Sequence, residues 1–198
     1  NSAEIRAKKR DELGLVDENW MLLSVGSDYK RKGVDRTLRV IGDMPKEMRN
    51  NVRFWVIGQD NPAPFEKLAK QLRISANVHF LQGSDDIPAF LQAADMFLHP
   101  AYSENTGTVL LEALVAGAPI FVTEVCGYAH YIRDAQCGVV LSEPYNSSGY
   151  LTQLVDALYD KGLRAQWREN ALRFAAEADL YSMPERATEI IESVVLAG

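Results

Sequence analysis

Apolar side chains along the chain gather in short unbroken runs, and longer segments with a helical pattern separate these runs. An unbroken apolar run rich in branched or aromatic residues is typical of a strand whose sheet is covered by helices on both faces. The pattern therefore predicts a six-stranded parallel sheet. Its strands are expected at residues 20–25, 52–57, 78–81, 96–98, 119–122 and 139–141.

Helices are predicted between these strands, at residues 33–41, 65–72, 87–93, 108–116 and 128–134. Such alternation is the pattern of a doubly wound, Rossmann-like α/β domain with three layers and right-handed crossovers. Three of the strands end at Gly26, Gly58 or Gly83, where a turn needs a positive φ or a close approach of the backbone.

The pattern changes to helix alone after about Ser147. Helices are predicted at residues 150–159 and 163–176. A last helix is predicted to open at residues 182–185, SMPE, which combine the spacing of a capping box with a proline in the first turn. These C-terminal helices are expected to pack around the sheet.

The chain has 198 residues, of which 47% are apolar, and this length and composition suit one globular domain. Its net charge of -6 and pI of about 5.1 argue against binding to a nucleic-acid backbone, which needs a basic face. A local basic cluster, Arg6, Lys8, Lys9 and Arg10, is expected on a solvated helix face. No apolar stretch approaches the roughly 20 residues that span a bilayer, so no transmembrane segment is predicted.

The chain begins without methionine and without a signal-peptide pattern, which suggests one domain of a longer protein. Cys126 and Cys137 are its only cysteines, too few for a disulfide framework and spaced unlike a zinc site, so a reducing compartment is expected. Cys126 is expected to be a small buried residue. Trp20, Trp55 and Trp167 are expected in core or domain packing.

Candidate chemistry begins at residues 101–119, AYSENTGTVLLEALVAGAP, which join a strand to a predicted helix. In an open α/β sheet, ligands bind outside the carboxyl ends of the strands. The free backbone N–H groups of Gly107, Thr108 and Val109 would face that crevice and, with the helix dipole, suit an anion such as a diphosphate. Gly107 would let a phosphate approach the backbone, because it has no Cβ.

Two glutamates flank the start of this helix. Glu112 lies about one turn into the helix, in a stretch that is apolar nearly all round, so it is predicted to be half-buried and partnered, with a plain surface residue as the alternative. A carboxylate beside a phosphate would repel it, so each glutamate is expected to face a neutral polyol. A ribose suits Glu112, and a sugar ring suits Glu104.

A cation for the diphosphate is predicted within residues 24–36, SVGSDYKRKGVDR. This segment leaves the first strand through Gly26 and reaches Arg31 and Lys32 where the next helix begins. Lysine is a compact phosphate donor, and arginine can bind phosphate in a bidentate fashion. A solvated basic turn is the alternative for three adjacent cations, but their place at the same sheet edge as Gly107 favours a phosphate site.

Other functions fit parts of this pattern. Glycosidases also carry two spaced carboxylates, but they have no use for a cationic turn and a helix start aimed at a diphosphate. A dinucleotide-dependent oxidoreductase is disfavoured, because the chain has no G-x-G-x-x-G. A non-catalytic nucleotide-binding module stays open. His99 is expected to be a satisfied structural histidine that also lies near the sugar, whereas His130 and Tyr131 fit a structural and a catalytic role equally well.

The motifs together resemble the retaining family 4 glycosyltransferases, whose GT-B fold sets two Rossmann-like domains across a cleft. The resemblance rests on Glu104-x7-Glu112, Ala116-Gly117-x-Pro119, the Lys32-Gly33 turn and residues 77–83, 94–102 and 123–138. It covers essentially the whole chain but implies only the C-terminal, donor-binding domain, residues 1–198, without the N-terminal acceptor domain. Residues 123–138 are especially similar to members that transfer glucose from UDP-glucose to the heptose of the lipopolysaccharide inner core.

The resemblance implies a role for each candidate residue. Lys32 and Arg31 would hold the diphosphate of the donor, together with the backbone N–H groups of Gly107, Thr108 and Val109. Glu112 would hold the ribose, Glu104 would contact the donor sugar, and the loop around Ser84 and Asp85 would meet the uracil edge. Many members carry an arginine where this chain has Ser27, and Arg31 would compensate for its absence.

The resemblance also implies how catalysis proceeds and with which partners. Lys32 and the helix start would stabilise the departing diphosphate, with Glu104 at the sugar, and no metal is expected, in keeping with the lack of an Asp-x-Asp motif. The implied partners are the nucleotide-sugar donor, the acceptor domain of the same protein and a glycolipid acceptor. The full enzyme would work in the cytoplasm, at the inner face of the inner membrane, and the isolated chain would bind donor without turnover.

Overall fold

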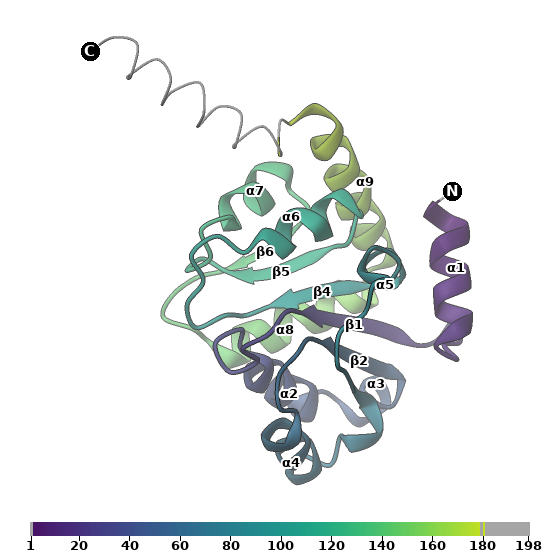
Figure 1. The fold of residues 1–198 in the computed structure, drawn as a ribbon, viewed down its shortest axis with the longest axis vertical. Helices are drawn as coiled ribbons and strands as arrows, with labels where there is room; N and C mark the ends of the chain where they lie inside the picture. The colour runs from purple at the N-terminus through teal and green to yellow at the C-terminus, as the bar shows by residue number, and fades with distance from the viewer. Residues whose placement is uncertain (1, 179, 181–198) are drawn as a thin grey trace.

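The structure is a computed structural model, and it describes residues 2–178 and 180. In chain order its elements are α1 (Ser2–Glu12), β1 (Trp20–Val25), α2 (Val34–Asp43), α3 (Lys46–Asn51), β2 (Val52–Ile57), α4 (Ala63–Gln71), the 3₁₀ turn η1 (Ser75–Asn77), β3 (Val78–Leu81), α5 (Ile87–Ala93), β4 (Met96–His99), α6 (Thr108–Val115), β5 (Ile120–Thr123), α7 (Ala129–Ala135), β6 (Gly138–Leu141), α8 (Ser147–Tyr159) and α9 (Lys161–Glu177). Strands and helices alternate up to β6, and helices alone follow (Figure 1). The helix predicted to open at residues 182–185 lies outside the described residues.

The strands form one parallel, 6-stranded sheet in the order β3-β2-β1-β4-β5-β6. The prediction of a six-stranded parallel sheet is therefore confirmed. After β1 the chain builds outward through β2 and β3, then returns to pair β4 with the other side of β1. The strand order thus reverses at the β1–β4 pair, and this is the place in a doubly wound sheet where ligands bind.

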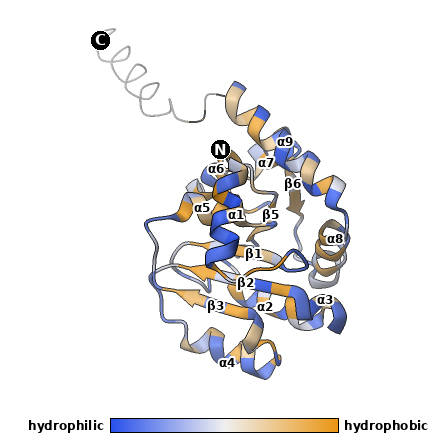
Figure 2. Cartoon of the chain, turned by 90° about the vertical axis from the view of Figure 1, so that its right-hand side faces the viewer, coloured by the Kyte–Doolittle hydropathy of each residue, from blue (hydrophilic) through white to orange (hydrophobic). Residues whose placement is uncertain are grey.

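Alternate side chains of each strand enter two apolar cores, one on each face of the sheet. Met21 and Leu23 of β1 pack into the core under α5, α6, α7 and α9, whereas Leu22 packs into the core under α2, α3, α4 and α8. Because both faces are covered, the strands are mostly apolar rather than alternating (Figure 2). Trp55 is buried in the first core, and Trp20 and Trp167 pack half-buried against the second, as expected.

Two short elements between β1 and β3 were not predicted. The helix α3 has the polar sequence KEMRNN and buries only Met48, so it carries little of the apolar periodicity that marks a helix. The turn η1 has no buried residue at all. Neither element therefore has an apolar pattern from which it could be predicted.

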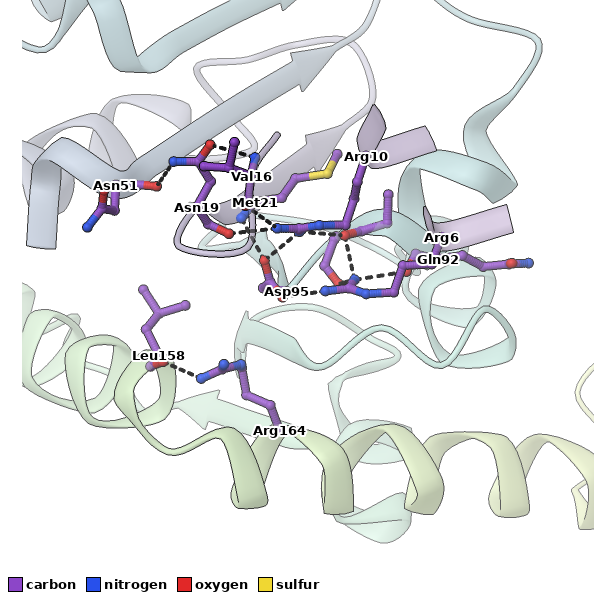
Figure 3. Close-up of polar contacts among 12 residues, drawn as sticks. Arg6, Arg10, Val16, Asn19, Met21, Asn51, Gln92, Asp95, Leu158 and Arg164 are labelled. Atoms are coloured by element: carbon purple, nitrogen blue, oxygen red, sulfur yellow. Dashed lines mark hydrogen bonds and ion pairs between the residues drawn. The ribbon is translucent and has the colours of Figure 1, made fainter. Parts of the chain in front are cut away.

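The basic cluster near the start of the chain was predicted on a solvated face, and that prediction is wrong for most of its members. The guanidinium groups of Arg6 and Arg10 lie 2.6 and 2.9 Å from the carboxylate of Asp95 (Figure 3). The side chain of Lys9 is only 12% exposed and pairs with two carboxylates, whereas that of Lys8 is 81% exposed. Because α1 buries no residue of its own, these charged contacts hold it against α5.

Candidate functional site

The candidate site lies where the loops after β1 and β4 leave the sheet. These strands are neighbours, so residues 26–33 and 100–107 emerge side by side at the carboxyl edge. The backbone N–H of Tyr102 donates to the carbonyl of Arg31 at 2.8 Å, and the guanidinium of Arg36 donates to the carbonyls of Pro100 and Ala101 at 3.2 and 2.9 Å. The two loops are therefore fastened to each other.

Gly33 is the residue that permits this close approach. Its φ is 74°, and a Cβ built on it would lie 2.0 Å from the carbonyl oxygen of Pro100. No side chain fits at that distance, so only glycine can stand where the two loops cross. The Lys32-Gly33 turn thus has a structural cause that is independent of any ligand.

A pocket of about 390 Å³ opens between the two loops, a size that suits a small-molecule ligand. It is lined by Val25, Gly26, Ser27, Arg31, Lys32, Glu104, Thr106, Gly107, Thr108, Val109 and Glu112. The structure therefore brings together every predicted site residue except Asp85. That residue is exposed on the loop after β3, and it does not line this pocket.

The helix α6 begins at the pocket wall. Gly107 precedes it with a φ of 80°, and no side chain caps the helix start. The first backbone N–H groups of a helix have no partner within it, so those of Thr108 and Val109 are free to bind an anion. A Cβ on Gly107 would lie 3.1 Å from Leu110 and 3.4 Å from the Cγ of Glu104, so this glycine also lets the loop pack onto its own helix.

Lys32 and Arg31 meet the same carboxylate oxygen. The Nζ of Lys32 lies 2.9 Å from the Oε2 of Glu104, and the Nη1 of Arg31 lies 3.0 Å from that oxygen. The stem of Lys32 crosses Gly26, where a Cβ would approach its Cε to 2.7 Å. Asp28, which sequence reasoning missed, orients Arg31 through a 2.9 Å contact with its Nε; the i, i+3 spacing of opposite charges was the available signal.

The charge of Glu104 is set by these cations. Its side chain is 11% exposed, and burial favours the neutral acid. The hydrogen bonds from Lys32 and Arg31 outweigh this burial and hold the pKa of Glu104 below its ordinary value. Glu104 is therefore an anion at neutral pH, with both cations of the pocket bound to it.

His99 ends β4 directly behind this cluster and is 1% exposed. Its Nε2 lies 3.6 Å from the Oε2 of Glu104, too far for a hydrogen bond, and it has no partner among the described residues. The expectation of a satisfied histidine is therefore wrong. Burial, and next the charge of Lys32, lower the pKa of His99 to about 4, so its ring is neutral.

Glu112 does not have the environment predicted for it. It is exposed, and its carboxylate has no hydrogen bond or ion pair among residues 2–178 and 180, because Thr108, Glu112 and Val115 form an open stripe on α6 while the residues between them are buried. The apolar stretch predicts cover all round the helix, but the i, i+4 and i+7 positions are exposed, and two of them, Thr108 and Glu112, line the pocket. Glu112 is thus free to bind a ligand, without being partnered beforehand.

The remaining candidates lie around this pocket. Cys126 is a buried free thiol, as predicted, and its segment pairs with the backbone of Glu104. His130 is exposed, and its Nδ1 lies 2.9 Å from the carbonyl of Gly127; its ring contacts that of Tyr131 at 4.1 Å. Neither ring lines the pocket. Ser27 does line it, and its hydroxyl accepts a bond from a backbone N–H on the next loop.

The described part of the chain offers neither a cluster of metal ligands nor a membrane-spanning helix. No group of three or more His, Cys, Asp or Glu residues there is placed to hold a metal ion. No helix there is both long enough and apolar enough to cross a membrane. The expectation that no metal takes part stays a prediction.

Comparison with known proteins adds to this geometry. Residues 5–174 match the family described as glycosyl transferases group 1. The chain is 47% identical over 191 residues to the lipopolysaccharide glucosyltransferase WaaG of Escherichia coli K12, covering 96% of this chain and 50% of that protein. It is 30% identical to a D-inositol 3-phosphate glycosyltransferase of Salinispora arenicola, covering 86% of this chain and 40% of that protein. It thus spans half or less of these relatives.

Solved structures agree with the fold. A crystal structure of WaaG, described as a glycosyltransferase involved in lipopolysaccharide biosynthesis, superposes with a TM-score of 0.91 at 46% identity over 94% of this chain and 50% of that one. The Anabaena protein HepE, solved with UDP-glucose, superposes with a TM-score of 0.83 at 20% identity, over 96% of this chain and 53% of that one, which shows a shared fold only. These matches do not support the glycosidase or oxidoreductase alternatives.

Proposed function

Because the chain belongs to the glycosyl transferases of group 1, we propose that it is the donor-binding domain of a retaining glycosyltransferase. The acceptor-binding domain would lie in the rest of a longer protein, since the chain spans about half the length of its relatives. The observation that carries the proposal is the pocket at the strand-order reversal, where two cations and an uncapped helix start face the same space.

Each side of this pocket suits one part of a nucleotide sugar. The diphosphate would bind between Lys32, Arg31 and the backbone N–H groups at the start of α6. Glu112, exposed one turn further along the helix, would accept hydrogen bonds from the ribose, and Glu104 would contact the sugar. The uracil would extend towards the loop after β3, which carries Asp85.

The chemistry follows from this placement of charge. As the bond between the sugar and the diphosphate breaks, negative charge grows on the β-phosphate, where Lys32 and the helix start would stabilise it. One preorganised donor of this kind is worth about 3 to 4 kcal/mol. The acceptor hydroxyl would enter on the face that the nucleotide leaves, which retains the anomeric configuration. The chain's own cations do this work in the scheme, so no metal is needed.

The proposed substrates follow WaaG, a relative that is similar to the chain in both sequence and fold. We propose glucose, from UDP-glucose, as the transferred sugar and the heptose of the lipopolysaccharide inner core as the acceptor, which is supported by 47% identity to WaaG. That acceptor would place the full enzyme at the cytoplasmic face of the inner membrane. A transferase that acts on another glycan is the alternative within the same fold.

Calorimetric titration tests the donor site directly. UDP and UDP-glucose are expected to bind more tightly than ADP or GDP, and UDP-galactose separates the hexoses. Lys32→Ala should weaken UDP binding about tenfold to a hundredfold, because a hydrogen bond between charged groups is worth about 1.5 to 3 kcal/mol. Glu112→Ala should weaken it through loss of the ribose contact. Lys67→Ala, which removes an exposed charge on α4, is the matched control and should change nothing.

Two outcomes would contradict this proposal. Equal affinity for UDP and ADP would refute the uridine assignment, and an effect of Lys67→Ala as large as that of Lys32→Ala would refute the site. A non-catalytic nucleotide-binding module is distinguished by adding the acceptor to the full-length protein. Glucose transfer there, with the isolated chain inactive, is the expected result.

A further inference from the structure

One wall of the pocket carries an anionic side chain, the carboxylate of Glu104. Lys32 and Arg31, the two cations that the proposed function assigns to the diphosphate, both bind the Oε2 of Glu104, at 2.9 and 3.0 Å. A diphosphate that recruits these cations competes with that oxygen for them, because each donor N–H that turns to the phosphate is lost to the carboxylate. Glu104 would then be left 11% exposed with no cation bound. A nearly buried carboxylate without a partner is costly.

The imidazole of His99 is already in place to bind the Glu104 carboxylate. The Nε2 of His99 is buried, lacks a partner among the described residues, and lies 3.6 Å from the same Oε2. A shift of well under 1 Å would bring the pair to the usual hydrogen-bond distance of about 2.9 Å. The ring itself is fixed, because it stacks on Phe97, with centroids 6.1 Å apart, and its backbone belongs to β4.

We propose that His99 is a positioning residue for Glu104: when a diphosphate takes over Lys32 and Arg31, the Nε2 of His99 replaces them at the Glu104 carboxylate, and His99 binds a proton. This inference rests on the proposed function. The proton comes from solvent and makes the ring an imidazolium, which donates through Nε2 to Glu104. The carboxylate would thereby stay ionised and oriented towards the sugar.

The charges around His99 support this uptake. Lys32 and Arg31 face it from the loop after β1, and Glu104 faces it from the loop after β4. Cys126, on the segment after β5, stays a neutral thiol, because burial raises its pKa to about 11. Burial and the two cations hold the ring neutral in the free protein. A bound diphosphate cancels the repulsion from those cations and leaves the attraction of Glu104, so protonation becomes easier.

Proton uptake is measured by calorimetry of this chain with UDP-glucose in buffers of different ionisation enthalpy, from pH 6 to pH 8. UDP-glucose is the probe because both its phosphates are esterified and neither titrates near neutral pH. The wild type should take up a fraction of a proton on binding, and that fraction should rise as the pH falls. His99→Gln, which can donate at the same place but cannot titrate, should bind without uptake and with affinity within about threefold.

His99→Phe keeps the ring stacking and removes the donor. It should bind UDP-glucose about fivefold to tenfold more weakly, and a thermal melt confirms that it is folded. Binding by the wild type without proton uptake, uptake retained in His99→Gln, or unchanged affinity in His99→Phe would each overturn this inference alone. Failure of the folded wild type to bind any uridine nucleotide would overturn the proposed function and this inference with it.

A second variant tests Glu104 as the internal competitor. UDP has no sugar, so Glu104→Gln removes the competing charge and nothing that UDP needs. UDP should therefore bind this variant about fivefold more tightly than the wild type, as expected for freeing an ion pair worth about 1 kcal/mol. UDP affinity that stays the same or falls would show that Glu104 does not compete with the diphosphate.

Discussion

Burial and charge act together most strongly at one residue, His99. Its pKa of about 4 in the folded chain lies below the ordinary value of 6.5, because the ring is buried beside Lys32. Below pH 6.5 the unfolded chain therefore binds a proton that the folded chain does not bind. The contribution of His99 to stability is complete above pH 6.5 and falls as the pH drops towards 4.

The lowered pKa of His99 predicts that the free energy of unfolding depends on pH. Between pH 6.5 and pH 4.5, the free energy of unfolding should fall, with His99 contributing at most about 1.4 kcal/mol per pH unit. His99→Phe should flatten that slope, because it removes the titrating group and keeps the packing on Phe97. Urea unfolding at a series of pH values measures it. An equal slope in both proteins would show that His99 titrates normally.

Glu112 shows at the scale of the residue what a local pattern leaves open. Its neighbours Leu111 and Ala113 are buried, so the segment looks covered on every side. Exposure of one narrow stripe depends on what lies beyond the helix, and here a pocket lies there rather than protein. The helical pattern of the sequence does not show whether other parts of the chain cover a given position of the helix.

The crossing of two loops is the feature of most consequence at the scale of elements. The loops after β1 and β4 carry both cations of the pocket and Glu104, the second of them leads into α6 with Glu112, and the two loops touch at Gly33 and Pro100. Their spacing sets the distance between Lys32 and the start of α6. The geometry of the site therefore depends on how closely the two loops pack at this crossing.

Substitution at the crossing should be severe. Gly33→Ala is expected to destabilise the chain by at least about 3 kcal/mol, because its Cβ would meet a backbone oxygen at 2.0 Å at a positive φ. Gly14→Ala is the matched control: its φ is 66°, and nothing lies within 4 Å of a Cβ there. It should cost only about 1 to 2 kcal/mol of backbone strain. Similar losses in urea unfolding would show that the loop crossing adds nothing.

At the scale of the whole molecule, α1 is attached by charge rather than by apolar burial. Arg6 and Arg10 both bind the carboxylate of Asp95, whose Oδ2 also accepts the backbone N–H of Met21 in β1 (Figure 3). One carboxylate thus joins the first helix, the end of α5 and the start of two central strands. Asp95 precedes β4 and His99 ends it, so this junction and the candidate pocket lie at opposite ends of that strand.

Removal of this carboxylate should cost stability without affecting the pocket. Asp95→Ala is expected to lower the free energy of unfolding by about 3 to 5 kcal/mol, because it leaves two partly buried guanidinium groups with backbone carbonyls as partners but without a carboxylate to balance their charge. Lys8→Ala, which removes an exposed charge from the same helix, should change it by no more than about 0.5 kcal/mol. UDP affinity of folded Asp95→Ala should stay within about twofold of the wild type. A stability loss equal to that of Lys8→Ala would refute the junction.

The amino-acid sequence by itself determined the alternation of strands and helices, because an apolar run without polar positions is stable only where helices cover both faces of a sheet. It also placed the glycines, cations and glutamates of the site at strand ends, where the loops of a parallel sheet gather at one edge. These features are local, because they depend only on the order of residues within each segment.

Only the tertiary structure decided which loops meet. The pairing of β1 with β4 brings Lys32 onto Glu104, 72 positions away, and sets His99 behind them, where its Nε2 has no hydrogen-bond partner among the described residues. It also placed Arg6 and Arg10 in a partly buried junction where the sequence indicated a solvated face. Contacts between residues far apart in the chain depend on strand order and on distances of a few ångströms, and the free energy of a charge depends on which neighbours replace water around it.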